Sequence, residues 1–514
     1  MRVALAKEVK AADQYTISSG ISSLALMEKA GRYIADHLLQ ELQKNNPTEL
    51  WIFAGKGNNG GDALVLARYL FSYGWKKIKV VLCAQESELT SETYTNWQKL
   101  KKLSIACQIA GKKELKVLAG NISPASWTVD GLLGIGFKGR LCSPYIEAVR
   151  CIQRGQRILS IDIPSGIEAD TGIAKGIAVT ADITYTIGFV KLGLLIPPGI
   201  DYAGRVIPID IGLRENPKSK ITGSRWLLTH AHVPNIPKRK VDCHKGDFGY
   251  LAILGGSPGM TGAPALTGLA ALRAGTGKVR IAIDSKSNAV LEKKVLEIMT
   301  QPLEEKRDKD QIRNLDQQCT AWVIGPGLST VSLSQERLSF ILKITPHPLL
   351  LDADALNIIA KHPMLFKYIP ENSIITPHPG EMARLIAKNT SYAQQHREEV
   401  ALHLAKKYKI FVVLKGARTI LATPDQKVFY NSTGNAGMAS AGMGDVLSGI
   451  IGGLLAQGFS PLKAAQLGIF LHGLAGDLAY DDGANGPVVL ARDVIQCLGN
   501  AITFGLKSKF RQKS

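Results

Sequence analysis

The chain has 514 residues, and because one hydrophobic core rarely grows beyond about 250–300 residues, at least two domains are expected. Hydrophobic residues make up 45% and charged residues 20% of the sequence, which is ordinary for a folded globular protein. The net charge of +19 favours acidic partners, which include nucleic acid, membrane surfaces and phosphorylated small molecules.

Neither a membrane span nor a secretion signal is expected. No apolar stretch reaches about 18 residues, and the best candidate, 187–200, is interrupted by Lys191 and two prolines. The first residues, MRVALAKEVKAADQ, lack a long apolar core and a cleavage-like site. The seven cysteines form no CxxC pair and are expected to be reduced. These features predict a cytoplasmic protein that binds no membrane.

The first half is predicted to alternate strands with helices. The predicted helices span 24–42 and 63–72, and the predicted strands span 50–54, 78–83, 127–133 and 158–163. This alternation is typical of a mostly parallel sheet. Because ligands of such sheets bind at the carboxyl ends of the strands, the loops after three of these strands are candidates for one shared site.

Each of the three loops has its own chemistry. The loop GKGNNGGD at 55–62 opens a helix, so its N–H groups suit a phosphate; the alternative is a tight turn with helix-capping side chains. The loop at 130–140, DGLLGIGFKGR, contains GxGxxG without the acidic residue that completes a dinucleotide fingerprint, and we interpret it as a phosphate-binding turn with Lys138 and Arg140 nearby. The loop DIPSG puts Asp162 at a strand end, where a carboxylate suits proton transfer, although a capping role fits that residue equally when it is taken alone.

Together, NNGGD, VDGLLGIG and DIPSG resemble the NAD(P)H-hydrate epimerase family over nearly all of residues 1–213. The resemblance implies a Rossmann-like three-layer domain with a parallel sheet at 1–215. It implies a potassium ion held by Asn59, Asp130 and Ser165, and we assign Asp162 as the acid/base. The residues that it implies for binding the hydrated cofactor are Asn58, Asn59, Gly60, Gly61, Asp62, Gly134, Ile135, Gly136, Phe137, Lys138, Gly139 and Arg140. The family usually has glycine at the position of Ala63, so this methyl group is expected to crowd the loop.

The regular pattern fades between 213 and 240, and a linker is predicted near 214–228. The pattern then resumes with a strand at 250–254 that leads into a Gly-rich loop. Further strands are predicted at 321–324, 349–351, 374–375 and 411–414, and a long helix is predicted after Gly444.

The densest motif of the second half is GNAGMASAGMGD at 434–445, directly before that helix. Successive N–H groups at a helix start form an anion hole for a phosphoryl group, and Asp445 can accept a proton from a hydroxyl; the alternative is a Gly-rich packing turn. TPHPGE fixes His378 between two prolines, which favours ligand contact. KGART at 415–419 offers cationic and backbone groups to a nucleotide phosphate. DADALN at 352–357 places two carboxylates where they suit either a metal or a helix cap.

TPHPGE, KGARTI and GNAGMASAGMGDVLSG resemble the ADP/ATP-dependent NAD(P)H-hydrate dehydratases, a branch of the ribokinase-like α/β fold, over roughly 225–505. The implied domain spans 225–510. The residues that the resemblance implies for binding the hydrated cofactor are Ala263, Gly327, His378 and Asp445, and those for the adenine nucleotide, which enters with Mg²⁺, are Lys415, Gly416, Ala417, Arg418, Thr419 and Gly444. The implied reaction phosphorylates the C6 hydroxyl of the S hydrate with Asp445 as base, and phosphate then leaves with the C5 proton.

The whole chain is thus expected to repair NADHX and NADPHX, the hydrated forms of NADH and NADPH, by epimerising the R and S forms and dehydrating the S form. ADP is expected by resemblance to the bacterial form, while no residue decides between ADP and ATP. Two alternatives are a ribokinase-like small-molecule kinase with a nucleotide-binding N-terminal domain, and a scaffold that binds nucleotide or RNA. The kinase leaves TPHPGE and the first half unexplained, and the loops lack the interleaved aromatic and basic residues of an RNA surface. We expect a homo-oligomer with no nucleic-acid partner.

Overall fold

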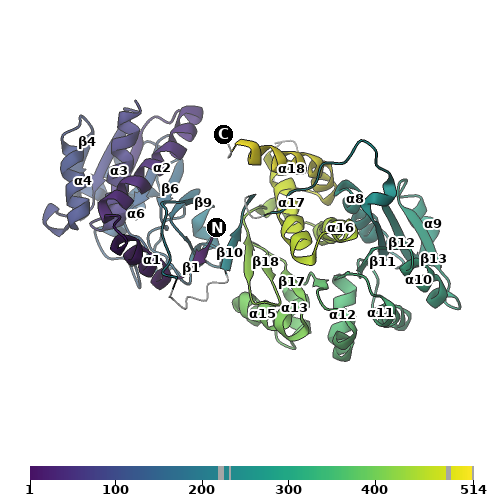
Figure 1. Ribbon diagram of the computed structural model, residues 1–514. Helices are drawn as coiled ribbons and strands as arrows, with labels where there is room; N and C mark the ends of the chain where they lie inside the picture. Colours follow the sequence, from purple (N-terminus) through teal and green to yellow (C-terminus); the bar gives the residue numbers. More distant parts are fainter. Residues whose placement is uncertain (218–224, 231–232, 482–487, 512–514) are drawn as a thin grey trace. The chain divides into compact units, whose positions relative to one another are not determined.

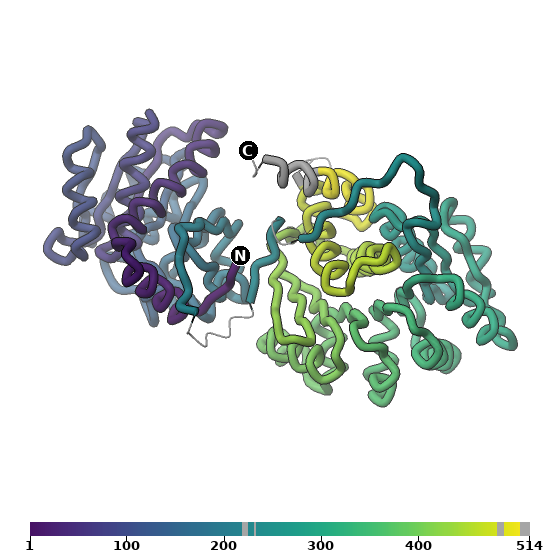
Figure 2. The backbone as a smooth tube through the Cα atoms, viewed as in Figure 1, coloured from purple at the N-terminus to yellow at the C-terminus, as the bar shows by residue number. Residues whose placement is uncertain are grey.

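The computed structural model describes residues 1–217, 225–230, 233–481 and 488–511. The chain divides into two compact units, Met1–Gly223 and Ser224–Ser514. Figure 1 colours the first unit from purple to blue and the second from teal to yellow, and Figure 2 follows the same path along the Cα trace. Each unit is built on one large sheet, so each is described by itself.

The sheet of the first unit has seven parallel strands in the order β4–β3–β2–β5–β6–β7–β9. The strands are β2 (Leu50–Ala54), β3 (Ile78–Leu82), β4 (Ala106–Ile109), β5 (Trp127–Gly131), β6 (Arg157–Ile161), β7 (Ile183–Ile187) and β9 (Arg205–Ile209). The chain winds outward in opposite directions from β2 and β5. A ligand crevice is expected at this reversal of strand order, at the carboxyl ends of the strands.

Helices cover both faces of this sheet, and a short parallel pair, β1 (Val3–Ala4) with β8 (Val190–Lys191), lies outside it. The helices are α1 (Ala6–Ser18), α2 (Ser23–Asn45), α3 (Asn58–Ser72), α4 (Ser91–Lys101), α5 (Lys112–Asn121), α6 (Tyr145–Ile152) and α7 (Ile200–Ala203). Ile52 of β2 faces a cluster with α2, α3 and α4, whereas the next residue, Phe53, faces a second cluster with α5 and α6. Side chains that alternate between two apolar layers produce the three-layer domain that the sequence predicted.

The second unit has a ten-stranded sheet in the order β10–β19–β18–β17–β16–β15–β14–β11–β12–β13. Its strands are β10 (Arg225–Leu228), β11 (Tyr250–Leu254), β12 (Lys278–Asp284), β13 (Met299–Leu303), β14 (Ala321–Ile324), β15 (Leu349–Leu351), β16 (Ile374–Ile375), β17 (Phe411–Leu414), β18 (Ile420–Ala422) and β19 (Val428–Asn431). All neighbouring pairs are parallel except β17–β18 and β18–β19, which are antiparallel. The carboxyl ends of β11 and β14 to β17 therefore meet at one edge.

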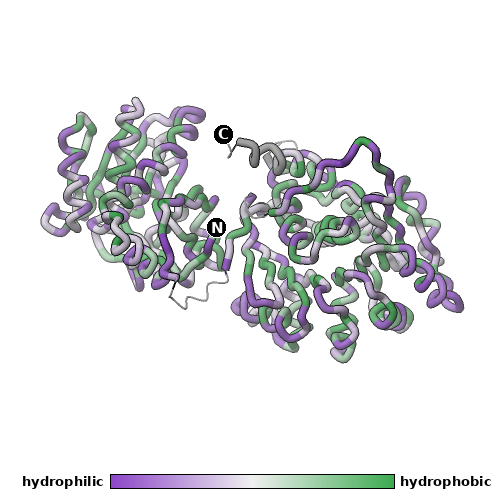
Figure 3. Tube along the Cα trace, viewed as in Figure 1, coloured by the Kyte–Doolittle hydropathy of each residue, from purple (hydrophilic) through white to green (hydrophobic). Residues whose placement is uncertain are grey.

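Apolar residues of α8, α16, α17 and α18 pack on one face of this sheet, against side chains such as Leu251 and Val323. The helices are α8 (Gly262–Arg273), α9 (Ser285–Glu292), α10 (Asp308–Asp316), α11 (Ser332–Ile344), α12 (Ala353–Lys361), α13 (Pro379–Leu385), α14 (Thr390–Gln395), α15 (Arg397–Tyr408), α16 (Met443–Ala456), α17 (Pro461–Asp481) and α18 (Ala491–Arg511). Figure 3 shows apolar residues along the inner strands and polar residues on outer helix turns. Among the described residues, no helix is long and apolar enough to cross a membrane.

The predicted α/β class with parallel sheets is confirmed. Some predicted boundaries were wrong. The helix expected at 63–72 already begins at Asn58, because the Gly-rich loop forms its first turn. The strand expected at 158–163 ends at Ile161, since Asp162 adopts a left-handed φ of 67°. The linker expected at 214–228 ends before Arg225, where β10 pairs with β19, and its residues 218–224 lie outside the described residues.

The methyl group of Ala63 lies in the second turn of α3, where it is buried against β5. An ideal Cβ placed on Gly131 would lie 2.5 Å from the Cβ of Ala63. The two positions therefore share the space of one methyl group, and the glycine in β5 accommodates the alanine in α3. The structure thus accounts for this departure from the family pattern without crowding of the loop.

This contact predicts a coupled pair of substitutions. Gly131→Ala should lower the free energy of unfolding by about 1–3 kcal/mol, the usual range for overpacking a core. Adding Ala63→Gly should recover part of that loss, because it removes the closest atom. Urea unfolding of the four variants in a double-mutant cycle measures the coupling, and strictly additive effects would contradict this contact.

Candidate active sites of the two units

A cavity of about 710 Å³ opens in the first unit at the carboxyl ends of its strands. Its walls come from α1, α2, the start of α3 and the loops after β5, β6 and β7. The residues expected from the sequence that line it are Asn58, Asn59, Asp62, Gly134, Ile135, Gly136, Phe137, Lys138 and Asp162. The structure thus brings the three predicted loops to one site of the size that small ligands occupy.

Six expected residues do not line this cavity. Gly60 and Gly61 serve close packing: an ideal Cβ on Gly60 would lie 1.9 Å from the carbonyl oxygen of Gly55, and one on Gly61 would lie 2.5 Å from Met27. Gly139 has a left-handed φ of 93° in its turn. The remaining three are Asp130 and Ser165, which are buried beneath the loops, and Arg140, which is exposed.

Asp130 is fully buried at the end of β5 and ties two loops together. Its carboxylate accepts hydrogen bonds from Ser165 Oγ at 2.6 Å, Ser165 N at 2.7 Å, Ser160 Oγ at 2.9 Å and Leu132 N at 3.2 Å. Burial raises the pKa of Asp130, while these hydrogen bonds oppose the rise. The carboxylate therefore fixes the loop after β6 relative to the loop after β5.

Asn59 holds a buried oxygen without a partner. Its amide nitrogen donates to Leu133 O at 2.8 Å, which directs Oδ1 away from that carbonyl. Oδ1 is buried and accepts no hydrogen bond from any described residue. A buried acceptor left unpaired costs free energy unless another group satisfies it. Oxygen donors suit hard cations, so the set of Asn59, Asp130 and Ser165 fits the potassium ion expected from the sequence.

Asp162 forms a buried ion pair with Lys191. Asp162 Oδ1 accepts from Lys191 Nζ and from Ile187 N at 3.1 Å, and Lys191 Nζ also donates to Ile187 O at 2.6 Å. Lys191 is 1% exposed and lines the cavity. Sequence reasoning missed this lysine as a site residue. The available signal was a single charge inside the apolar stretch 187–200, since a lysine in such a setting needs a partner.

A second carboxyl group of this cavity has a contrasting environment. Asp62 is 9% exposed, and its side chain makes no hydrogen bond with any part of the chain that the structure describes. Burial raises the pKa of Asp62 well above its usual range, and the nearby charges of Asp162 and Asp13 add to the rise while Lys191 opposes it. The two carboxyl groups therefore differ in their surroundings: Asp162 accepts hydrogen bonds from Lys191 and Ile187, whereas no described residue donates one to Asp62.

In the second unit, an ion pair joins the ends of two strands. Lys415 Nζ, after β17, donates to Asp352 Oδ1, after β15, at 2.6 Å and lies 3.7 Å from Glu381 Oε2. Ser448 Oγ of α16 donates to the other oxygen of Asp352 at 2.7 Å. Burial opposes the charge of Lys415, but the surrounding carboxylates raise its pKa overall. An ideal Cβ on Gly444 would lie 3.3 Å from Nζ, so the ammonium group lies against the start of α16.

The sequence left the role of the two aspartates in DADALN open between a metal and a helix cap. Asp352 makes no cap hydrogen bond and instead pairs with Lys415. Asp354 accepts from Ser329 N at 2.8 Å and from Asn357 Nδ2 at 3.1 Å. Asp352 is therefore part of an ion pair, and Asp354 anchors the loop that contains Ser329.

Asp445 and His378 face this ion pair from two helix starts. Burial raises the pKa of Asp445 to about 7, with Asp352 and Glu381 adding to the rise and Lys415 opposing it. His378 Nδ1 caps α13 by accepting from Gly380 N at 3.0 Å and Glu381 N at 3.3 Å. Burial and the charges of Lys415 and Arg384 lower the pKa of His378. His378 is thus held as a neutral ring, and Asp445 titrates near neutral pH.

The other expected residues lie in turns at the same edge. An ideal Cβ on Gly327, which has a left-handed φ of 60°, would lie 3.4 Å from Ala263 Cβ. Arg418 Nη1 donates to Ser432 O at 2.8 Å, and Thr419 Oγ1 donates to Gly416 O at 3.1 Å, so the KGART turn holds its own shape. The third residue of that turn, Ala417, is exposed.

The glycine-rich loop before α16 rests on α17, a support that the sequence did not reveal. Asp477 accepts from Gly434 N at 2.9 Å and from Asn435 Nδ2 at 2.9 Å. Asn435 Oδ1 in turn accepts from Gly437 N at 2.9 Å. These bonds fix the loop path that leads to the N–H groups at the start of α16.

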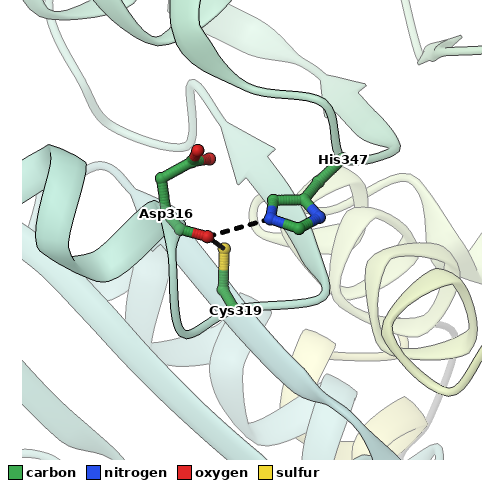
Figure 4. A group of neighbouring side chains, drawn as sticks. All are labelled: Asp316, Cys319 and His347. Carbon is green, nitrogen blue, oxygen red and sulfur yellow. Dashed lines mark hydrogen bonds between the residues drawn. The ribbon is translucent and has the colours of Figure 1, made fainter.

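A third cluster of polar side chains serves structure. Asp316, Cys319 and His347 lie close together at the end of α10 (Figure 4). His347 Nε2 lies 2.9 Å from the carbonyl oxygen of Asp316, and the Cys319 thiol bonds to the same oxygen. The Asp316 carboxylate is turned away and accepts from Trp322 Nε1 at 2.8 Å. Each group therefore has a protein partner that closes the end of the helix.

Two α/β units, each with paired and unpaired carboxyl groups at the carboxyl edge of its sheet, define a two-domain enzyme. Residues 23–193 match the family model described as YjeF-related protein N-terminus, and residues 251–498 match that of NAD(P)H-hydrate dehydratase. The bifunctional NAD(P)H-hydrate repair enzyme Nnr of Moorella thermoacetica is 38% identical over 470 residues, which cover 89% of this chain and 88% of that protein. The Escherichia coli enzyme of the same name is 36% identical over 479 residues, 90% of this chain and 87% of that one.

Among solved structures, the ADP/ATP-dependent NAD(P)H-hydrate dehydratase of Bacillus subtilis, co-crystallised with ATP and Mg²⁺, is 29% identical. It covers 55% of this chain and 98% of its own, with a TM-score of 0.48. The relatives that match along nearly the whole length decide the identity. The chain belongs to the family of bifunctional NAD(P)H-hydrate repair enzymes, as the motifs predicted.

The Lys415–Asp352 pair makes a prediction for stability. Lys415→Met should lower the unfolding free energy of the second unit by about 3–5 kcal/mol, because it leaves the buried Asp352 charge unpaired. The double variant Lys415→Met with Asp352→Asn should lose less unfolding free energy than Lys415→Met alone. The exposed pair Lys409–Glu371 is the matched control, and Lys409→Met should change little. Equal losses for the two lysines in urea unfolding would contradict this account.

Proposed function

We propose that the first unit, within residues 1–215, epimerises the R and S forms of NADHX and NADPHX. We further propose that the second, within 225–510, dehydrates the S form at the expense of ADP or ATP. One observation supports this proposal most. At the carboxyl edge of each sheet, a lysine–aspartate ion pair lies near a second carboxyl group whose pKa is raised. The net charge of +19 suits substrates that carry phosphates.

In the first unit, Asp162 is the proposed base. Lys191 and Ile187 N donate hydrogen bonds to its Oδ1, which orients the group. Its Oδ2 lies 3.5 Å from an ideal Cβ on Gly134, so this loop glycine leaves room beside the carboxylate. The N–H groups at the start of α3 and the lysines at the cavity, Lys56 and Lys138, suit the substrate phosphates. Potassium, when bound by Asn59, Asp130 and Ser165, supplies positive charge beside these anionic groups.

In the second unit, Asp445 is the proposed base for the C6 hydroxyl of the S hydrate. As this hydroxyl loses its proton, it attacks the terminal phosphorus of the nucleotide, and the N–H groups at the start of α16 stabilise the transferring phosphoryl group. Mg²⁺ that enters with the nucleotide neutralises phosphate charge. Lys415 contacts the phosphates from the KGART turn. Phosphate then leaves C6 as the C5 proton is lost, which restores the C5=C6 bond.

The substrate contacts of Ala263, Gly327 and His378, and the nucleotide contacts of 415–419 and Gly444, are part of this proposal. None of the seven cysteines is part of a disulfide, which fits the reducing cytoplasm. The homo-oligomer stays a prediction.

Single substitutions should separate the two activities. Asp445→Asn should abolish dehydration and spare epimerisation, because it removes the base of the second unit alone, and Asp162→Asn should do the reverse. Chromatography of R and S hydrates, with and without nucleotide, measures both activities in each variant. If either substitution reduced both activities equally, the assignment of one reaction to each unit would be wrong. Accumulation of a stable phosphorylated product by the wild type would favour the kinase alternative instead.

The titration of Asp445 predicts a pH dependence. Because a base must be ionised, kcat/KM for dehydration should rise with pH through about 7 and then level off. This rise in kcat/KM reports an ionisation of the free enzyme, so it should appear with either nucleotide. A profile that stays flat between pH values well below and well above this value would contradict Asp445 as the base.

A further inference from the structure

Three carboxyl groups line the cavity of the first unit, and two of them, Asp62 and Asp162, have different hydrogen-bond environments. Asp162 comes from the loop after β6 and is bound through Oδ1 to Lys191 and Ile187. Asp62 comes from α3, is 9% exposed and makes no hydrogen bond with any described residue. A carboxyl group that is nine-tenths buried without a donor is poorly stabilised as an anion. The two groups are therefore not interchangeable.

We propose that Asp62 is the catalytic acid of the epimerase and that Asp162 is its base, with Lys191 as the positioning residue that holds the Asp162 carboxylate in place. This inference rests on the epimerase activity proposed above, and it gives Asp62 a chemical role beyond contact with the substrate. An acid and a base whose surroundings separate their protonation states are the arrangement that acid–base catalysis at neutral pH requires.

The charged groups around Asp62 support this division. Burial comes first in raising the pKa of Asp62, followed by the negative charges of Asp162 and Asp13, while Lys191 acts in the opposite direction. The other cations at the cavity, Lys10, Lys56 and Lys138, lie in its wall, and no ion pair joins any of them to Asp62. Burial and the neighbouring negative charges therefore favour the protonated form of Asp62, and no described residue accepts a hydrogen bond from it.

The hydroxyl group of the hydrate can accept this proton. C6 carries a hydroxyl group and is bonded to the ring nitrogen N1. Asp62 donates its proton to the hydroxyl oxygen, the C6–O bond breaks, and its electron pair leaves with water. The N1 lone pair forms a C6=N1 double bond, so a cation is formed beside the Asp162 carboxylate. Water then adds to the opposite face of C6 and gives one proton to Asp162, and proton exchange with solvent restores both groups.

The pH–rate profile of epimerisation tests this assignment in the full-length protein with saturating potassium chloride. For the wild type, kcat/KM should fall at high pH as Asp62 is ionised. Asp62→Asn should be slower by about 10²–10⁴-fold, the usual contribution of a general acid, and should lose the fall at high pH. Lys191→Met should move this fall to still higher pH, because the charge of Lys191 opposes the rise in the pKa of Asp62.

Asp13→Asn is the matched control, since Asp13 lines the same cavity and burial also raises its pKa. It should keep the fall at high pH. Asp62→Glu, which retains an acid, should keep the fall at high pH and guards against a folding defect in the asparagine variant. If Asp62→Asn kept the fall at high pH, or if Asp62→Glu lost it, Asp62 would not be the acid. A wild type that does not epimerise would instead overturn the proposed function.

A second readout follows the C6–O bond. In ¹⁸O-labelled water, each epimerisation should place one solvent oxygen at C6, and mass spectrometry of the product measures it. Retention of the original oxygen would overturn the water-loss step.

Discussion

In each unit, a lysine that is buried or partly buried pairs with a buried aspartate at the carboxyl edge of the sheet. Lys191 pairs with Asp162 in the first unit, and Lys415 pairs with Asp352 in the second. Removing two charges from water is costly, so both partners must stay in place for either to be tolerated. Each pair thereby joins the ends of separate strands or loops, and the geometry of the surrounding site depends on it.

The same constraint acts on a second carboxyl group nearby. The negative charge of the paired aspartate makes its neighbour harder to ionise: Asp162 raises the pKa of Asp62, and Asp352 raises that of Asp445. Burial is the larger cause in both cases. Two unrelated sheets therefore reach a similar electrostatic arrangement, in which one carboxylate is held by a lysine and the pKa of a second carboxyl group is raised.

The sequence predicted the loops better than the contacts between them. Glycines and a following helix revealed the Gly-rich loops that lead into α3 and α16, since both signals lie within a few neighbouring residues. The partner of Asp162 is 29 positions away and the partner of Asp352 is 63 positions away, so these pairs depend on strand order. Strand order follows from the packing of the whole sheet, which local pattern does not specify. Ala63 illustrates the same limit, because the glycine that accommodates it, Gly131, lies in another strand.

The central claim is that one chain restores both epimers of a hydrated cofactor. The most direct measurement is the near-ultraviolet absorbance of NADH after the purified protein is mixed with R and S NADHX, Mg²⁺, potassium and either ADP or ATP. The account predicts recovery of the full NADH absorbance, which requires both activities, and the nucleotide that supports it identifies the phosphoryl donor. Recovery that stops at the fraction of S hydrate, or no recovery with either nucleotide, would contradict it.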